Sequence, residues 1–330
     1  MADFLGGELS YRVIGAEIAS PAITGSIVEP VIECATPALD PAVATEQQSL
    51  PSFFIVGPPR TGSTWLYEIL STCTRLPGPS KETRFFDVHF HRGLEWYLAH
   101  YQDSHADRQM GEVAPTYFAS AAARERISDL APNAKIVCVF RNPVERVLSL
   151  YRLKLAYGHI RWPLEQAIER DPELLESSQY SGNLRLWQRS FGAHNVWPGI
   201  YDDLRANPQA FVDSLADFIG ISRFQLARSH QVPVHDSEGM TYPRSYYRTR
   251  LALYMADWFK ARRLDKFVVA LKRSPVRHFI LGGGKPFRQP KPQLLRRLYE
   301  RLRPEVEALE AMLQRDLSAW RNPKAVNVDC

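Results

Sequence analysis

Short apolar runs and longer amphipathic patterns alternate along the chain from residue 51 onward. Residues 53–57 and 135–140 are almost entirely apolar and include β-branched side chains. Such runs indicate strands that are covered on both faces, as in a parallel sheet. Residues 109–113 and 195–201 are two further candidate strands, and 64–71 has apolar residues at helical spacing. Together these runs predict an α/β fold, in which helices flank a central, mainly parallel sheet in three layers.

Helical patterns occupy much of the remaining chain. After the second apolar strand, Asn142 is a good N-cap residue and Pro143 suits the first position of a helix. Further amphipathic patterns cover residues 208–219, 246–264 and 291–320. We therefore expect a helical C-terminal third. Nothing resembles an internal repeat or an interdomain linker, which predicts one domain over residues 51–330.

The first fifty residues differ from the rest of the chain. They are rich in Ala, Pro, Thr, Ile and Val, and Arg12 is their single basic residue. Short β-prone pieces such as residues 26–33 are candidates for weak strand pairing. We expect residues 1–50 to form a partly unstructured N-terminal extension.

Composition excludes several classes of protein. The chain has 330 residues, of which 45% are hydrophobic, so collagenous and largely disordered proteins are excluded. Lys and Arg number 41 against 36 Asp and Glu, a net charge of +5. This small excess does not indicate nucleic-acid binding, and we expect no nucleic-acid partner. It suits an anionic small ligand if the arginines converge on one site.

The cysteines and the apolar runs bear on the cellular compartment. Cys34, Cys73, Cys138 and Cys330 are widely separated, which favours free thiols over a zinc site or a disulfide framework. No apolar run approaches the roughly 18 residues that cross a bilayer. We therefore expect a cytoplasmic protein without a membrane anchor.

The loop after the first apolar strand nearly matches a phosphate-binding loop. Residues 57–64 read Gly-Pro-Pro-Arg-Thr-Gly-Ser-Thr, against the pattern G-x-x-x-x-G-K-S/T. Ser63 stands where nucleoside triphosphatases have the lysine that reaches the terminal phosphates. A glycine loop that opens a helix still directs backbone N–H groups at an anion, and Arg60 supplies a cation. An ordinary turn with a solvated arginine is the alternative, but the flanking strand and helix favour a P-loop-like fold.

The second strand also ends in residues suited to an anion. Residues 140–151 read FRNPVERVLSLY. Arg141 leaves the strand, and Arg146 and Ser149 share one face of the following helix. We expect Arg141 and Ser149 to hold a second phosphate. Because open parallel sheets bind ligands at the carboxyl ends of their strands, both anion sites should lie at one edge.

These residues resemble a known enzyme family. GPPRTGSTWL is similar to the 5′-phosphosulfate loop of sulfotransferases that use 3′-phosphoadenosine-5′-phosphosulfate (PAPS), and FRNPVERVLSLY is similar to their 3′-phosphate motif. The stretch SKETRFFD, residues 80–87, resembles the heparan-type carbohydrate sulfotransferases. Further matching segments are Gly111–Phe118, Tyr180–Phe191 and Gly282–Pro290. The resemblance extends over about residues 51–320.

The resemblance implies PAPS as the donor, adenosine 3′,5′-bisphosphate (PAP) as the product, and no metal ion. The 3′-phosphate would lie on Arg141 and Ser149, and a late loop with Lys285 and Arg288 would cover the donor. The 5′-phosphosulfate would lie on the phosphate loop. Its binding residues there would be Arg60, Thr61, Gly62, Ser63, Thr64 and Trp65.

The resemblance also implies catalytic roles. Glu82 matches the family's catalytic glutamate and would take the proton of an acceptor hydroxyl, with an amine as the less favoured acceptor, during in-line attack on sulfur. Arg60 would stabilise charge on the leaving oxygen. A histidine is the alternative base, as in small-molecule sulfotransferases, and His89 and His91 are nearby in sequence.

The acceptor is expected to be a small molecule or a carbohydrate. Candidate acceptor contacts in matching segments are Arg84, Asp87, Tyr117 and Trp187. The heparan enzymes commonly have Glu-Lys-Ser/Thr-Pro where residues 112–115 read Glu-Val-Ala-Pro, and their loop-closing disulfide has no counterpart here. These departures favour a soluble, bacterial-type enzyme whose acceptor is smaller or less charged than heparan.

Two other classes of function remain open. A P-loop nucleotide kinase or triphosphatase would share the glycine loop, although Ser63 at the lysine position argues against it. A non-catalytic nucleotide-binding protein would share both anion sites without the base.

Overall fold

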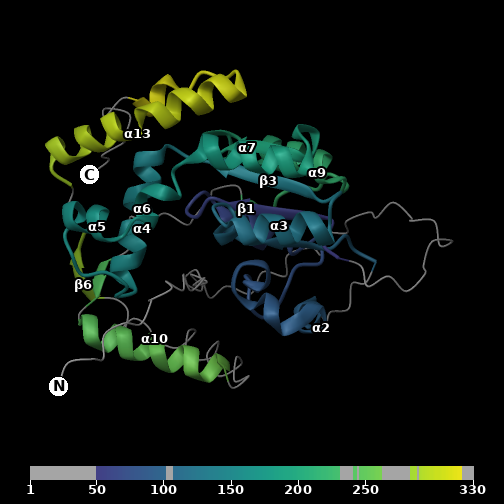
Figure 1. Cartoon of the computed structure of the whole chain (residues 1–330), viewed down its shortest axis with the longest axis horizontal. Coiled ribbons are helices and arrows are strands. Elements are labelled where there is room, and N and C mark those ends of the chain that lie inside the picture. The colour runs from purple at the N-terminus through teal and green to yellow at the C-terminus, as the bar shows by residue number, and fades with distance from the viewer. Residues whose placement is uncertain are drawn as a thin grey trace.

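The computed structural model describes residues 50–101, 107–230, 241–243, 245–261, 283–287 and 290–321 (Figure 1). The expected N-terminal extension lies outside the described residues, except for Leu50. Arg288 in the expected donor-covering loop is also outside them.

Four parallel strands form the central sheet. They are β1 (Phe53–Gly57), β2 (Gly111–Val113), β3 (Lys135–Phe140) and β4 (Val196–Ile200), in the spatial order β2-β1-β3-β4. The predicted parallel sheet is therefore confirmed, although β2 begins two residues later than the sequence pattern suggested. The chain runs from β1 to one neighbour and then crosses to β3 on the other side. A change of direction of this kind creates the crevice in which open α/β sheets bind ligands.

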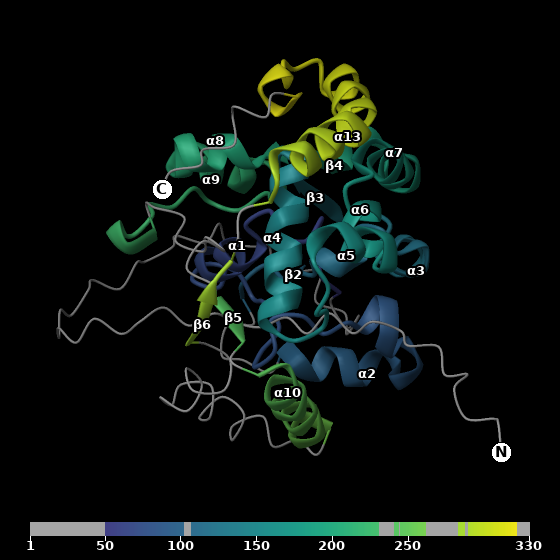
Figure 2. The same ribbon diagram turned by 90° about the vertical axis from the view of Figure 1, so that its left-hand side faces the viewer.

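Helices α3 (Ala121–Leu130) and α7 (Tyr180–Phe191) cover one face of the sheet. Phe54 and Val56 of β1 point to this side and belong to the same buried cluster as residues of both helices. Figure 2 shows α3 and α7 together on one side of the strands. The period-2 alternation of an all-apolar strand thus supplies side chains to both layers.

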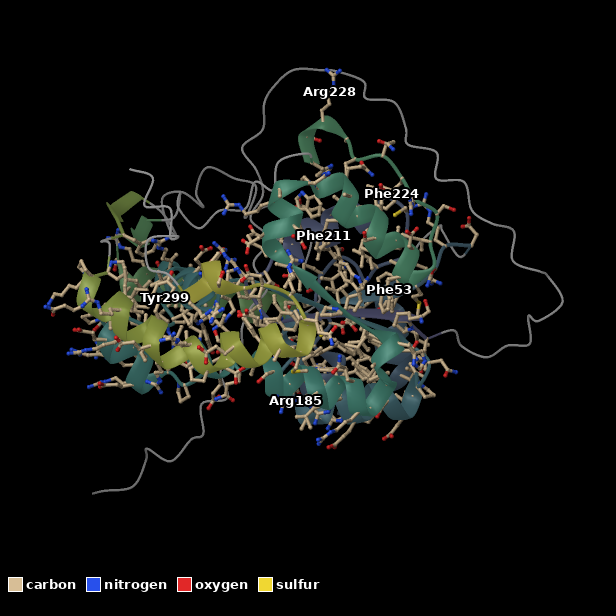
Figure 3. All side chains as sticks on the ribbon, turned by 90° about the horizontal axis from the view of Figure 1, so that it is seen from above. Phe53, Arg185, Phe211, Phe224, Arg228 and Tyr299 are labelled. Carbon is tan, nitrogen blue, oxygen red and sulfur yellow. The ribbon has the colours of Figure 1, made fainter. Side chains whose placement is uncertain are left out.

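Helices α1 (Ser63–Leu70) and α9 (Pro208–Ile219) cover the opposite face. Phe53 of β1 packs there with Phe211 of α9 and Phe224, which follows that helix, in a second buried cluster. These three rings are labelled close together in Figure 3. The two clusters on either side of one sheet confirm the predicted three-layer α/β fold.

A third cluster joins α4 to the C-terminal helix. Asn142 caps α4 (Pro143–Ala156) as predicted, because its side-chain oxygen accepts from the N–H groups of Val144 at 3.0 Å and Glu145 at 3.4 Å. Tyr299 of α13 (Pro292–Leu313) lies in the buried cluster that α4 shares with α13 (Figure 3). This packing fixes the start of α4 at the end of β3.

The C-terminal third is mainly helical in its described part. Helix α10 (Tyr246–Ala261) matches the predicted pattern at 246–264 as far as the description extends. Helix α13 ends at Leu313, earlier than predicted, because Gln314 adopts a left-handed φ of 49°. A short 3₁₀ turn follows at Ser318–Arg321.

Several smaller elements were not predicted. Strands β5 (Thr241–Pro243) and β6 (Gly283–Pro286) form a separate antiparallel pair. The glycines of β6 give no alternating pattern by which the sequence could have indicated a strand. The other α-helices among the described residues are α2 (Gly93–Leu98), α5 (Leu164–Arg170), α6 (Glu173–Glu176) and α8 (Tyr201–Ala206). Within the described residues, no helix has both the length and the apolar character that crossing a bilayer requires.

Gly57 at the end of β1 permits the sharp entry into the phosphate loop. Its φ is 111°, and a Cβ atom there would lie 2.6 Å from the carbonyl oxygen of Pro115. Both facts exclude a side chain, because L-residues rarely adopt this φ and the neighbouring atom belongs to backbone.

We predict that Gly57→Ala lowers the free energy of unfolding by at least about 1–3 kcal/mol, the cost of a strained backbone alone. Urea denaturation followed by circular dichroism measures the change. Gly182→Ala is the matched control, since this glycine is exposed in α7 and a methyl group there meets nothing within 4 Å. It should be neutral or stabilising. A Gly57→Ala variant as stable as the wild type would contradict the steric argument.

Candidate functional site

The phosphate loop, residues 57–64, connects β1 to α1 and includes residues with a left-handed backbone conformation. Arg60 and Gly62 both have left-handed φ values, 72° and 90°. The hydroxyl of Thr61 donates to the carbonyl oxygen of Pro58 at 2.7 Å and so closes the turn. A Cβ atom on Gly62 would lie 3.2 Å from the ring of Tyr201, which packs against the loop. The loop is therefore held by internal and tertiary contacts.

The N-terminus of α1 offers backbone donors at the end of this loop. Its first helical hydrogen bond runs from the N–H of Leu66 to Gly62. The N–H groups of Ser63, Thr64 and Trp65 thus precede the helical ladder. Donors of this kind, together with the helix dipole, bind anions. The indole of Trp65 is buried and donates to the carbonyl oxygen of His230 at 3.2 Å, so only the backbone of Trp65 serves this arrangement.

One hydrogen bond joins the two motifs that the sequence analysis assigned to phosphates. The Nε of Arg60 donates to the Oγ of Ser149 on α4 at 2.9 Å. The two residues are 89 positions apart in the chain, and Ser149 is buried. The expected sites for the two anionic groups of one donor are therefore contiguous.

Arg141 lies at the carboxyl end of β3, where α4 begins (Figure 1). Its Nε and Nη2 donate to Oε2 of Glu145 at 3.0 and 2.9 Å, and its guanidinium lies 4.8 Å from the ring centroid of Tyr201. Its carbonyl oxygen accepts from the hydroxyl of Tyr180 at 3.0 Å. Arg141 is thus positioned beside the phosphate loop with Glu145 as its counterion.

Arg146 has a role different from that of its neighbours in the motif. It is completely buried, and its guanidinium donates to the Oγ of Ser178 at 2.8 Å and to the carbonyl oxygen of Leu174 at 2.6 Å. These contacts attach α4 to the segment before α7. Although Arg146 and Ser149 are three residues apart, only Ser149 contacts the phosphate loop through a described hydrogen bond.

The segment that carries Glu82 lies against the phosphate loop. Lys81 extends its ammonium group to 3.2 Å from the Oγ of Ser63 and 3.4 Å from the Oγ1 of Thr64. The same group is 3.4 Å from Oε1 of Glu82. The other carboxylate oxygen of Glu82 is buried and has no hydrogen-bond partner in the described structure. Glu82 therefore lies near the phosphate loop, and Lys81 contacts the start of α1, which the sequence pattern did not predict.

A buried carboxylate holds this segment in place. Glu112 of β2 is completely buried and accepts from the N–H of Thr83 at 3.3 Å and from its hydroxyl at 2.7 Å. The hydroxyls of Tyr97 and Tyr117 also donate to it, at 2.8 and 3.1 Å. Thr83 directly follows Glu82, so the network fixes the backbone next to the candidate base.

The network also determines the protonation of Glu112. Burial raises the pKa of Glu112 from its ordinary value of 4.5 to about 7, and the hydrogen bonds from Thr83, Tyr97 and Tyr117 oppose this effect. Burial and the neighbouring Glu112 raise the pKa values of Tyr97, Tyr101 and Tyr117 well above their usual range. The tyrosines remain hydroxyl donors near neutral pH, and Glu112 is the group in this network that titrates there.

Two of the four expected acceptor contacts belong to the core. Tyr117 is completely buried in the Glu112 network, and the indole of Trp187 is completely buried and donates to the carbonyl oxygen of Phe118 at 2.9 Å. Core packing accounts for both side chains, so we assign neither to an acceptor surface. Arg84 and Asp87 form an ion pair at 2.7 Å just after Glu82 and stay partly accessible.

The other residues that the sequence analysis named are the two alternative bases and the two basic residues of the late loop. The ring of His89 packs edge-on against Trp96 with centroids 5.4 Å apart, and His91 is exposed. The backbone of Lys285 forms part of β6, and Arg288 lies outside the described residues. Phe85 and Phe86, which follow Glu82 in the chain, pack into the core with Tyr97.

Comparison with protein families decides the identity of this fold and loop arrangement. The model of the sulfotransferase domain matches residues 50–232, which is more than half of the chain and contains both phosphate motifs and the Glu82 segment. The chain belongs to the sulfotransferase family. The resemblance inferred from the two motifs is thereby confirmed.

Curated relatives of this sulfotransferase chain are much longer proteins. The bifunctional heparan sulfate N-deacetylase/N-sulfotransferase 2 of Bos taurus is 32% identical over 198 residues, which cover 53% of this chain and 22% of that protein. The corresponding protein 1 of Caenorhabditis elegans is 27% identical over 205 residues, covering 56% and 24%. The match thus spans about a quarter or less of these relatives.

A solved structure supports the sulfotransferase fold. The sulfotransferase from Alicyclobacillus acidocaldarius superposes with a TM-score of 0.60 at 20% identity, over 83% of this chain and all of that one. At this level of identity the similarity establishes the fold alone.

We predict that Glu112 makes folding stability depend on pH. Its folded-state pKa of about 7 exceeds the ordinary 4.5, so the folded protein holds the proton more tightly than the unfolded chain does. The resulting stability, about 3 kcal/mol, is complete below the unfolded pKa and is lost as the pH rises through 7. Urea denaturation from pH 4.5 to 8 should therefore show a larger loss for the wild type than for Glu112→Gln.

Glu125→Gln is the control for this measurement, because Glu125 is exposed on α3. It should retain the pH dependence of the wild type. Parallel stability curves for the wild type and Glu112→Gln would show that Glu112 does not titrate as described.

Proposed function

We propose that this protein transfers a sulfuryl group from PAPS to a hydroxyl group of a small-molecule or carbohydrate acceptor. The observation that carries the proposal is the hydrogen bond from Arg60 to Ser149, which makes the two expected anion sites one continuous surface. A nucleotide with anionic groups at both its 3′ and 5′ positions requires such a surface. Membership in the sulfotransferase family supports the same conclusion.

The donor's charged groups match the polar groups that line this surface. The N–H groups at the start of α1 and the guanidinium of Arg60 suit the 5′-phosphosulfate, since oriented amides and planar cations bind such oxygens. Arg141 and Ser149 suit the 3′-phosphate at the beginning of α4. Binding of that phosphate would compete with Glu145 for the Arg141 guanidinium.

Glu82 is the proposed general base. Its unpartnered, buried Oε2 is available to accept a proton, whereas Oε1 faces Lys81. The acceptor oxygen forms a bond to sulfur as its proton moves to Glu82, and the bond from sulfur to the bridging oxygen breaks. PAP leaves with the bonding electrons, and Arg60 stabilises the charge that develops on the leaving oxygen.

Arg84 and Asp87 are proposed to contact the acceptor. Oδ1 of Asp87 is buried and, like Oε2 of Glu82, has no hydrogen-bond partner in the described structure. Buried carboxylate oxygens normally have donors, so we propose that a bound molecule supplies them to these two neighbouring oxygens. Hydroxyl groups of an acceptor would do so.

Binding of the donor nucleotide can be measured by thermal shift. PAP at one hundred times its dissociation constant should stabilise the protein by about 2.7 kcal/mol without Mg²⁺. ATP with Mg²⁺ should have little effect, because the site is suited to a 3′-phosphate. The reverse pattern would favour a P-loop kinase or triphosphatase and overturn the proposal.

Replacement of the base separates catalysis from binding. Glu82→Gln should lower sulfate transfer from PAPS by about 10²–10⁴-fold, the usual contribution of a positioned general base. It should keep the stabilisation by PAP. The measurement is a labelled-sulfate transfer screen over hydroxyl-bearing metabolites and sugars, with Glu125→Gln as the control that should match the wild type. Unchanged turnover in Glu82→Gln would remove this residue from the mechanism.

A further inference from the structure

Lys81 occupies a place that the family resemblance does not assign. In phosphate loops of nucleoside triphosphatases a lysine precedes the Ser/Thr of the helix start. Here Ser63 stands at that position in the sequence. In the structure, the ammonium group of Lys81 lies 3.2 Å from the Oγ of Ser63 and 3.4 Å from the Oγ1 of Thr64. A lysine from another segment thus reaches the same place.

We propose that Lys81 is a second cation of the 5′-phosphosulfate site and replaces in space the lysine that the phosphate loop lacks. This inference rests on the proposed function, because it assigns Lys81 to one end of the same donor. Arg60 and Lys81 then bind the transferred group and its phosphate from two different segments of the chain.

The burial of Lys81 supports this assignment. Its side chain is only 9% exposed, and Glu82 is its partner at 3.4 Å. All three contacts of the ammonium group are longer than the usual 2.7–2.9 Å of a charge-assisted hydrogen bond. Its three N–H donors are thus only weakly engaged, and a bound anion could replace one of the two hydroxyl acceptors at a shorter distance. An anion on the α1 amides would be such an acceptor.

The charges around Lys81 lead to the same conclusion. Burial lowers the pKa of Lys81, the carboxylate of Glu82 opposes this, and the positive charge of Arg60 lowers it further. Two cations that repel each other beside a helix N-terminus are stabilised when an anion binds between them.

The backbone on which Lys81 stands is fixed. Thr83, two residues later, donates both its N–H and its hydroxyl to the buried Glu112. This anchoring keeps the Lys81 stem directed at the loop, and it places the cation next to Glu82, on the side where the acceptor would attack. Lys81 therefore belongs at the 5′ end of the donor, beside the start of α1, whereas Arg141 and Ser149 belong at the 3′ end.

The position of Lys81 can be tested with two nucleotides that differ only at the 5′ end. Isothermal titration calorimetry compares PAP with adenosine 3′-monophosphate, which lacks the 5′-phosphate. Lys81→Met should weaken PAP binding by about 10–100-fold, the loss expected for a hydrogen bond between charged groups. It should leave the affinity for adenosine 3′-monophosphate within about twofold of the wild type, because this ligand has no group for Lys81 to contact.

Three further variants define the outcome. Lys81→Arg keeps the charge and should retain most of the PAP affinity, and Lys81→Gln provides a polar replacement if the methionine variant does not fold. Lys291→Met is the control, because Lys291 is exposed before α13 and should leave both affinities unchanged.

Two results would overturn the inference about Lys81. Equal PAP affinity in Lys81→Met, Lys81→Gln and the wild type would show that the ammonium does not contact the 5′ group. Equal weakening of both nucleotides would indicate a structural role alone. Failure of the wild type to bind PAP would instead overturn the proposed function, so the two failures are distinguishable.

Discussion

The parallel pairing of β1 with β3 is the constraint on which the candidate site depends. These two strands are neighbours in the middle of the sheet, and the chain leaves both at the same edge. One strand continues into the phosphate loop and α1, and the other into Arg141 and α4. The hydrogen bond between Arg60 and Ser149 is possible only because of this adjacency. The strands are buried on both faces, so the hydrophobic core fixes the separation of the polar groups.

A second constraint comes from the buried carboxylate of Glu112 on β2. Its four hydrogen bonds come from Thr83, Tyr97 and Tyr117, which lie on segments separate from its own strand. A buried acidic group is costly unless such donors satisfy it. In return, the network gives the Glu82 segment a single position beside the phosphate loop. The candidate site therefore has two parts. Glu112 on β2 holds the Glu82 segment, and the loops that follow β1 and β3 carry the expected phosphate-binding residues.

The sheet, the two phosphate motifs and the helix cap at Asn142 can be predicted from the sequence, because each depends on a local pattern. The contact between Lys81 and Ser63 cannot be predicted in this way, because the fold brings together two residues that are 18 positions apart. Glu112 had a weak signal, an acidic residue in an otherwise apolar strand segment. Motif matching alone makes Trp187 a candidate acceptor contact, and its complete burial follows only from the packing of α7.

A crystal structure of the protein with PAP would test the central claim most directly. We predict the 5′-phosphate within hydrogen-bonding distance of the amides of Ser63–Trp65. We also predict the 3′-phosphate beside Arg141 and Ser149, with the Arg141–Glu145 ion pair opened or shared. PAP bound in the reverse orientation, or bound away from the carboxyl ends of β1 and β3, would contradict the account.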